Sequence, residues 1–286
     1  MQPITATETK ERAPVQSPAT LSSVGTALSK DGTWIAFDRI GNGSPVILVD
    51  GALCCRSMGP SAPLAKLLAP RFTVFTYDRR GRGESSDTAP YAVEREVEDL
   101  EAVLYEAGGT AFVWGSSSGA VIALEAAKRL PGIKKLAFYE APFIVDDSRA
   151  TTQEDWTRID EAIASGRRSD AVKFFMRMVG VPGIVLTVMQ WLPVWTKLKA
   201  VAHTLPHDGA LVQDYEKGRP LPPAQWAAVT VPALVMAGAK SSTWMRQGNL
   251  ALANVLPHAK YRALDGQTHA LKPHVHAPIL AEFFKS

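Results

Sequence analysis

The sequence has little cysteine and little net charge, and each shortage excludes a class of protein. Its two cysteines, Cys54 and Cys55, are neighbours, and neighbouring cysteines rarely form a structural disulfide. We therefore expect two free thiols in a reducing compartment, which favours a cytoplasmic protein. A net charge of +3 over 286 residues, without a basic stripe that contains aromatic residues, argues against nucleic acid as a partner.

The sequence also lacks a long apolar run. Its most apolar stretch, residues 179–195, is interrupted by two prolines and is shorter than the ~20 residues that a membrane-spanning helix needs. We predict no membrane span and interpret this stretch as a lid over a pocket. Residues 1–23 are rich in Thr, Pro, Ser and Ala and lack the apolar segment of a secretory signal. They are predicted to form a disordered tail.

Short apolar runs alternate with helical segments along most of the chain. The runs lie at residues 33–38, 45–49, 72–77, 111–115, 134–139, 233–237 and 260–264. Such alternation predicts an α/β protein with a doubly wound, mostly parallel sheet, formed by residues 24–147 and 229–286. Between them, residues 148–228 have helical periodicity with aromatic and Met-rich faces, which predicts an inserted helical cap.

One short motif carries the chemistry. The apolar run that ends at residue 115 continues into Gly115-x-Ser117-x-Gly119 and then into a segment rich in helix formers. This spacing is typical of a nucleophile elbow, in which a strained turn exposes the middle side chain above a helix N-terminus. Small residues are also common in ordinary turns, so features elsewhere in the sequence are needed to distinguish a catalytic elbow from an ordinary turn.

Three features together resemble the α/β-hydrolase family over residues 25–286. They are the elbow, the turn Asp78-x-Arg80-Gly81-x-Gly83-x-Ser85, and His269 placed after the last predicted strand. The resemblance implies that Ser117 is a nucleophile and His269 its general base. A serine at the elbow excludes the covalent chemistry of related dehalogenases and epoxide hydrolases, which need a carboxylate there.

A serine nucleophile and its histidine base are usually completed by an acidic residue, and together the three form a triad. In this sequence no acidic residue stands at the position usual for the family. That position follows the run 233–237, and residues 238–242 (Gly-Ala-Lys-Ser-Ser) contain no carboxylate. Glu140 lies at the end of the preceding predicted strand, where a subset of haloalkane dehalogenases looks similar. We predict that Glu140 orients His269. Asp146 or Asp147 in this role, or a Ser–His pair without an acid, are the alternatives.

The resemblance also implies an oxyanion hole formed by the backbone N–H groups of Ala52 and Ser118. Asp50 stands where the family usually has a histidine. A carboxylate near an oxyanion is unfavourable, so we expect it to be hydrogen-bonded or aimed away, for example toward Arg79 or Arg80. Arg80 is expected to hold its own loop in place.

The apolar cap predicts an apolar pocket, with Met176, Met189, Trp191 and Trp195 as its candidate lining. We therefore predict a serine hydrolase that cleaves a hydrophobic carboxylic ester or lactone with a small apolar acyl group, without cofactor or metal. Carbon–carbon bond hydrolysis, perhydrolysis, acyl transfer to an alcohol and non-catalytic ligand binding are the alternatives. The sequence leaves the oligomeric state open, a homodimer included.

Overall fold

A single twisted sheet forms the centre of the protein in the computed structural model, which describes residues 22–149 and 152–286. Within these residues the sheet has eight strands in the order β1-β2-β4-β3-β5-β6-β7-β8. The pairs β1–β2 and β2–β4 are antiparallel, and the remaining neighbours are parallel. The strands are β1 (Ser22–Leu28), β2 (Trp34–Ile40), β3 (Ser44–Val49), β4 (Phe72–Tyr77), β5 (Ala111–Ser116), β6 (Ile133–Tyr139), β7 (Ala233–Gly238) and β8 (Ala259–Leu264).

The predicted fold class is confirmed, with one addition at the edge of the sheet. The sequence pattern did not indicate β1, which pairs with β2 along its whole length. It begins at Ser22, inside the segment predicted as a tail, and residues 1–21 of that prediction lie outside the described residues. The central strands are apolar on both faces, as expected for strands covered by helices on each side.

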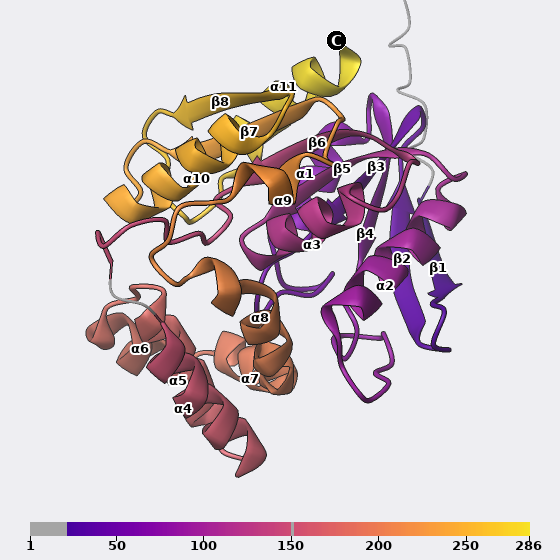
Figure 1. Ribbon diagram of the computed structural model, residues 1–286. Coiled ribbons are helices and arrows are strands. Elements are labelled where there is room, and N and C mark those ends of the chain that lie inside the picture. Colours follow the sequence, from indigo (N-terminus) through magenta and orange to yellow (C-terminus); the bar gives the residue numbers. More distant parts are fainter. Residues whose placement is uncertain (1–21, 150–151) are drawn as a thin grey trace, which may run out of the picture.

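Two layers of helices cover the two faces of the sheet (Figure 1). One core lies between the sheet and the pair α1 and α11, and the other lies under α2, α3 and α10 and continues into the helical insertion. These helices are α1 (Ser61–Leu68), α2 (Val93–Glu106), α3 (Ser118–Ala127), α10 (Thr243–Val255) and α11 (Pro273–Lys285). No helix in the described ranges is both long and apolar enough to cross a membrane.

A helical insertion lies between β6 and β7, in the interval predicted for the cap. It comprises α4 (Gln153–Ala164), α5 (Arg168–Met178), α6 (Gly183–Met189), α7 (Pro193–Val201), η1 (Ala202–Thr204), α8 (Leu205–Val212), η2 (Gln213–Tyr215) and α9 (Pro223–Trp226). Figure 1 shows α4 to α7 grouped beyond one end of the sheet. Helix α8 contacts α4 on one side and α2 and α3 on the other, so it joins this group to the core.

Candidate active site

The turn between β5 and α3 has the geometry of a nucleophile elbow. Ser117 has φ 53° and ψ −129°, and α3 begins at the next residue. A Cβ atom at Gly115 would lie 2.5 Å from the carbonyl oxygen of Gly119, and one at Gly119 would lie 2.3 Å from that of Val49. Both positions therefore require glycine, because the strand, the turn and the helix approach too closely for a side chain.

Strained backbone is concentrated around this turn. In the described part of the chain, three residues other than glycine have positive φ: Leu53 (59°), Ser117 (53°) and Glu140 (51°). Such angles cost about 1–3 kcal/mol each and gather at functional sites. The three residues follow β3, β5 and β6, whose carboxyl ends meet at one edge of the sheet. The strain makes this edge of the sheet a candidate functional site.

His269 and Glu140 form a directly hydrogen-bonded pair. The Nδ1 atom of His269 lies 2.7 Å from Oε2 of Glu140, whose side chain is fully buried. The other oxygen of Glu140 accepts hydrogen bonds from the backbone N–H of Gly238 (2.7 Å) and from the hydroxyl of Ser241. These two donors lie in the segment where the family usually carries its acid. Here that segment holds a glutamate supplied by the neighbouring strand.

The two predicted oxyanion donors are backbone N–H groups near Ser117. Among the hydrogen bonds of the described residues, neither the N–H of Ala52 nor that of Ser118 is a donor. A Cβ atom at Gly51 would lie 2.9 Å from Cβ of Ser117, so glycine lets this loop pass directly beside the elbow. Both predicted oxyanion donors are therefore without an acceptor among the described residues.

Asp50 is hydrogen-bonded, but not by the arginines named from the sequence. Its Oδ1 accepts a hydrogen bond of 2.7 Å from the hydroxyl of Ser61. Arg79 and Arg80 instead bind other carboxylates of the core and the insertion. Burial raises the pKa of Asp50 to about 7, against the opposing effects of the Ser61 hydrogen bond and the positive charge of Arg82.

A cavity of about 860 Å³ opens over the elbow. Ser117, His269 and Ala52 line it, together with apolar side chains that include Phe175, Met176, Val181 and Leu271. A second cavity of about 480 Å³ is also lined by Ser117 and His269, together with Arg149, Lys240 and Trp244. Both volumes are in the range of small-molecule sites.

The four residues predicted to line the pocket are found in different surroundings. Met176 lines the larger cavity, whereas the other three are absent from the lining of both. Trp191 is 88% exposed, and Trp195 is buried with its indole N–H donated to Ser169. Met189 packs against the core of the insertion. Helical periodicity cannot separate these three environments, because a cap helix has a core face, a cavity face and a solvent face.

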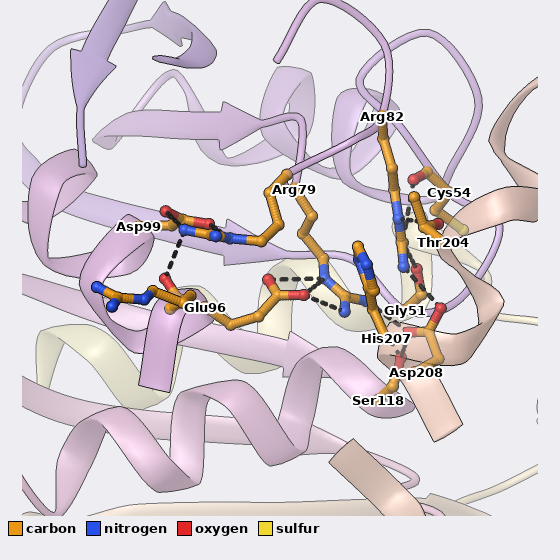
Figure 2. A network of polar contacts seen from close by, with 12 residues as sticks. Gly51, Cys54, Arg79, Arg82, Glu96, Asp99, Ser118, Thr204, His207 and Asp208 are labelled. Carbon is orange, nitrogen blue, oxygen red and sulfur yellow. Dashed lines mark hydrogen bonds and ion pairs between the residues drawn. The ribbon is translucent and has the colours of Figure 1, made fainter. Parts of the chain in front are cut away.

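The sequence pattern did not single out a buried ion-pair network beside the elbow (Figure 2). Arg79 and Arg82, which follow β4, both bind the carboxylate of Asp208 on α8. Burial opposes ionisation of Asp208, but the two arginines hold its pKa below the ordinary aspartate value. A carboxylate within the apolar helix α8 is the sequence signal that points to such a partner, since an isolated buried charge would be very unfavourable.

Comparison with known proteins agrees with this fold. The profile of the alpha/beta hydrolase family matches residues 19–282. The chain belongs to that family. A solved alpha/beta hydrolase from Sphaerobacter thermophilus DSM 20745 is 50% identical, with a TM-score of 0.84 over 91% of this chain and 100% of the other.

Two curated relatives are more distant from this alpha/beta hydrolase. A pimeloyl-[acyl-carrier protein] methyl ester esterase of Xanthomonas campestris is 27% identical over 251 residues, which cover 82% of this chain and 91% of the relative. The uncharacterized hydrolase YraK of Bacillus subtilis is 29% identical over 159 residues, or 53% of this chain. That match spans 56% of YraK, so it concerns about half of the relative.

Proposed function

We propose that this alpha/beta hydrolase is a serine carboxylic ester hydrolase that acts on a hydrophobic ester or lactone through an acyl-enzyme intermediate. The contact between His269 and Glu140, at a cavity that Ser117 also lines, carries the proposal. A carboxylate on Nδ1 leaves Nε2 of the imidazole as the proton acceptor, which is the role a serine nucleophile requires. The similarity to the Xanthomonas relative, a methyl ester esterase, supports the same reaction class.

The proposed reaction has two steps. His269 takes the proton of the Ser117 hydroxyl while its oxygen attacks the ester carbonyl, and the N–H groups of Ala52 and Ser118 stabilise the resulting oxyanion. The imidazolium then protonates the departing alcohol, which leaves an acyl group on Ser117. In the second step His269 activates a water molecule, which releases the acid and restores the hydroxyl.

The two cavities favour an ester with unlike halves. The larger cavity, lined by Phe175, Met176 and Leu271, suits an apolar group of moderate size. The smaller one has polar and charged groups in its lining, Ser241 and Lys240 among them. We assign the apolar acyl group to the larger cavity, because that cavity also includes the predicted oxyanion donor Ala52.

The test combines covalent labelling with turnover. The protein is incubated with a fluorophosphonate probe and, separately, with p-nitrophenyl esters of increasing acyl length. We expect the label on Ser117, identified by peptide mass, and a loss of turnover of at least about 10⁴-fold in Ser117→Ala. Ser165→Ala, at the exposed C-terminal end of α4, is the control and should retain both properties.

The outcomes separate the alternatives. Labelling of Ser117 without ester turnover would favour carbon–carbon bond hydrolysis, perhydrolysis or acyl transfer on the same nucleophile. A protein that is neither labelled nor active would overturn the serine mechanism and favour the ligand-binding alternative. Turnover that survives in Ser117→Ala would place the chemistry on a different group.

A further inference from the structure

The buried network around Asp208 reaches both sides of the elbow. Figure 2 shows the carboxylate of Asp208 between Arg82 and Ser118. Its Oδ2 accepts a hydrogen bond of 2.7 Å from Nη2 of Arg82, and its Oδ1 accepts bonds of 2.7 Å from Nη1 of Arg79 and from the hydroxyl of Ser118. Asp208 and the two arginines are each about 1% exposed, so water competes little for these contacts.

The contacts of Arg82 in this network hold the loop that contains Ala52. Nη1 of Arg82 donates to the carbonyl oxygen of Gly51 (2.7 Å) and also to that of Cys54 (3.3 Å). The carbonyl of Gly51 and the N–H of Ala52 belong to one planar trans peptide, in which they point in opposite directions. When Arg82 holds this carbonyl on the side of α8, it therefore also sets the direction of the Ala52 N–H.

The contact between Asp208 and Ser118 holds the start of α3. Ser118 is the first residue of this helix, and its side chain is held by Asp208 while its N–H has no acceptor among the described residues. The carbonyl of Ser117, in the same peptide as that N–H, accepts a hydrogen bond of 3.0 Å from the N–H of Ala120. The second donor is thus oriented by the helix and anchored through its own hydroxyl.

We propose that Asp208 is a positioning residue for the oxyanion hole, which acts through Arg82 on the Ala52 N–H and through Ser118 on the other donor. The inference rests on the proposed function and adds that a carboxylate of the cap is needed to align both donors. Preorganised donors aimed at the developing charge contribute strongly, and the loss of one costs about 10²–10³-fold in kcat. A single cap residue that acts on both should therefore affect kcat more than KM.

The same loop contains a matched control. Arg80 binds Asp99 through two hydrogen bonds of 2.7 and 2.8 Å, and both side chains are fully buried. Neither of the two contacts Gly51, Cys54 or Ser118 among the described residues. Asp99→Asn therefore breaks a buried arginine–aspartate pair of the same kind, with a similar loss of stability, but without direct effect on the oxyanion donors.

The experiment compares Asp208→Asn and Ser118→Ala with Asp99→Asn in the full chain. We expect kcat for a p-nitrophenyl ester to fall about 10²-fold in Asp208→Asn and about tenfold in Ser118→Ala, with KM within about threefold. The affinity for an alkyl trifluoromethyl ketone, which forms a tetrahedral adduct with Ser117, should fall in proportion to kcat/KM. Asp99→Asn should keep kcat and this affinity within about threefold, whatever its thermal stability.

Three results would overturn the proposal. The first is a folded Asp208→Asn protein with kcat near that of the wild type. The second is an equal loss of kcat in Asp99→Asn, which would indicate general destabilisation. The third is a kcat near that of the wild type in Ser118→Ala, which decides the question if Asp208→Asn does not fold, because this variant removes one contact of the carboxylate and leaves the ion pairs in place. A wild-type protein without labelling at Ser117 would instead refute the proposed function, and this inference with it.

Discussion

The two sides of the candidate site are built in different ways. On the acid side, Glu140, Ser241 and His269 come from the loops after β6, β7 and β8, so the sheet alone brings them together. On the oxyanion side, the loop after β3 and the start of α3 are tied by Arg82 and Asp208 to the insertion. We infer that the proposed acid–base pair depends on the core fold alone, whereas the proposed oxyanion hole also depends on how the helical insertion packs against the core.

The largest effect should come from the acid side. Glu140→Gln keeps the shape of the side chain but offers His269 an amide in place of a carboxylate, which favours the wrong imidazole tautomer. We expect kcat to fall about 10³–10⁴-fold with a small change in KM. Steady-state kinetics with a p-nitrophenyl ester measure both constants.

Asp99→Asn again serves as the control, because it removes a buried carboxylate charge away from His269. A Glu140→Gln protein that is folded and retains more than a tenth of the wild-type kcat would contradict the assignment of the acid. In that case Asp146→Asn and Asp147→Asn would be measured next. If neither has an effect, a Ser–His pair without an acid is the remaining hypothesis.

The buried carboxyl groups of the two sides, Glu140 and Asp50, also differ in the number of their hydrogen-bond partners. Glu140 is hydrogen-bonded to three residues, whereas Asp50 is hydrogen-bonded to a single residue, Ser61, within the described part of the chain. Burial raises the pKa of Asp50 from 3.8 to about 7. The folded protein then retains a proton that the unfolded chain loses near pH 4. Its stability should fall as the pH rises from about 4 to 7 and stay level above.

Asp50→Asn should remove this fall while keeping an oxygen that accepts from Ser61. The shift from 3.8 to about 7 corresponds to an upper value of about 4 kcal/mol at 1.36 kcal/mol per pKa unit. We therefore expect the variant to be more stable than the wild type at pH 8 and similar to it at pH 4.5. Urea unfolding at the two pH values tests this, and a difference independent of pH would refute it.

The elbow and the residues of the acid side could largely be predicted from the sequence. The elbow is a local motif, and its two glycines are needed because backbone atoms lie 2.3–2.5 Å from where their Cβ atoms would be. Glu140 was predicted from the resemblance to α/β hydrolases, because residues 238–242 at the family's usual position contain no carboxylate and a subset of haloalkane dehalogenases looks similar at the strand end that Glu140 occupies. What the sequence did not indicate is that Ser241 donates to Glu140, since this contact joins residues 101 positions apart.

The contacts of the oxyanion side were harder to predict from the sequence, for a physical reason. Arg82 and Asp208 are 126 positions apart, and their pairing depends on how the insertion folds back onto the core. No periodicity or turn pattern reports such a contact. The sequence instead suggested that Arg79 or Arg80 attracts Asp50, because nearness along the chain was the available guide. The exposed Trp191 and buried Trp195 reflect the same difficulty within the cap.

A smaller effect is expected at Ser241. Its hydroxyl is one of three donors to Glu140, and a hydrogen bond to a charged group is worth about 1.5–3 kcal/mol. Because the Gly238 N–H and His269 remain, we expect Ser241→Ala to lower kcat about 3- to 30-fold with KM nearly unchanged. Ser241→Thr keeps the hydroxyl and should restore most of the activity. Equal losses in both variants would indicate a steric role instead.

The smallest expected quantity is the coupling between the two sides. Glu140 and Asp208 share no hydrogen-bond partner among the described residues, and the loss of a triad member leaves the contribution of an oxyanion hole intact. In the cycle formed by Glu140→Gln, Asp208→Asn and the double variant, the changes in log kcat/KM should therefore add, with a coupling free energy within about 0.5 kcal/mol. Single-turnover rates of acyl-enzyme formation extend the measurement to the slow double variant. A coupling of 2 kcal/mol or more would mean that the seating of the cap also orients His269, and the two sides would then act as one unit.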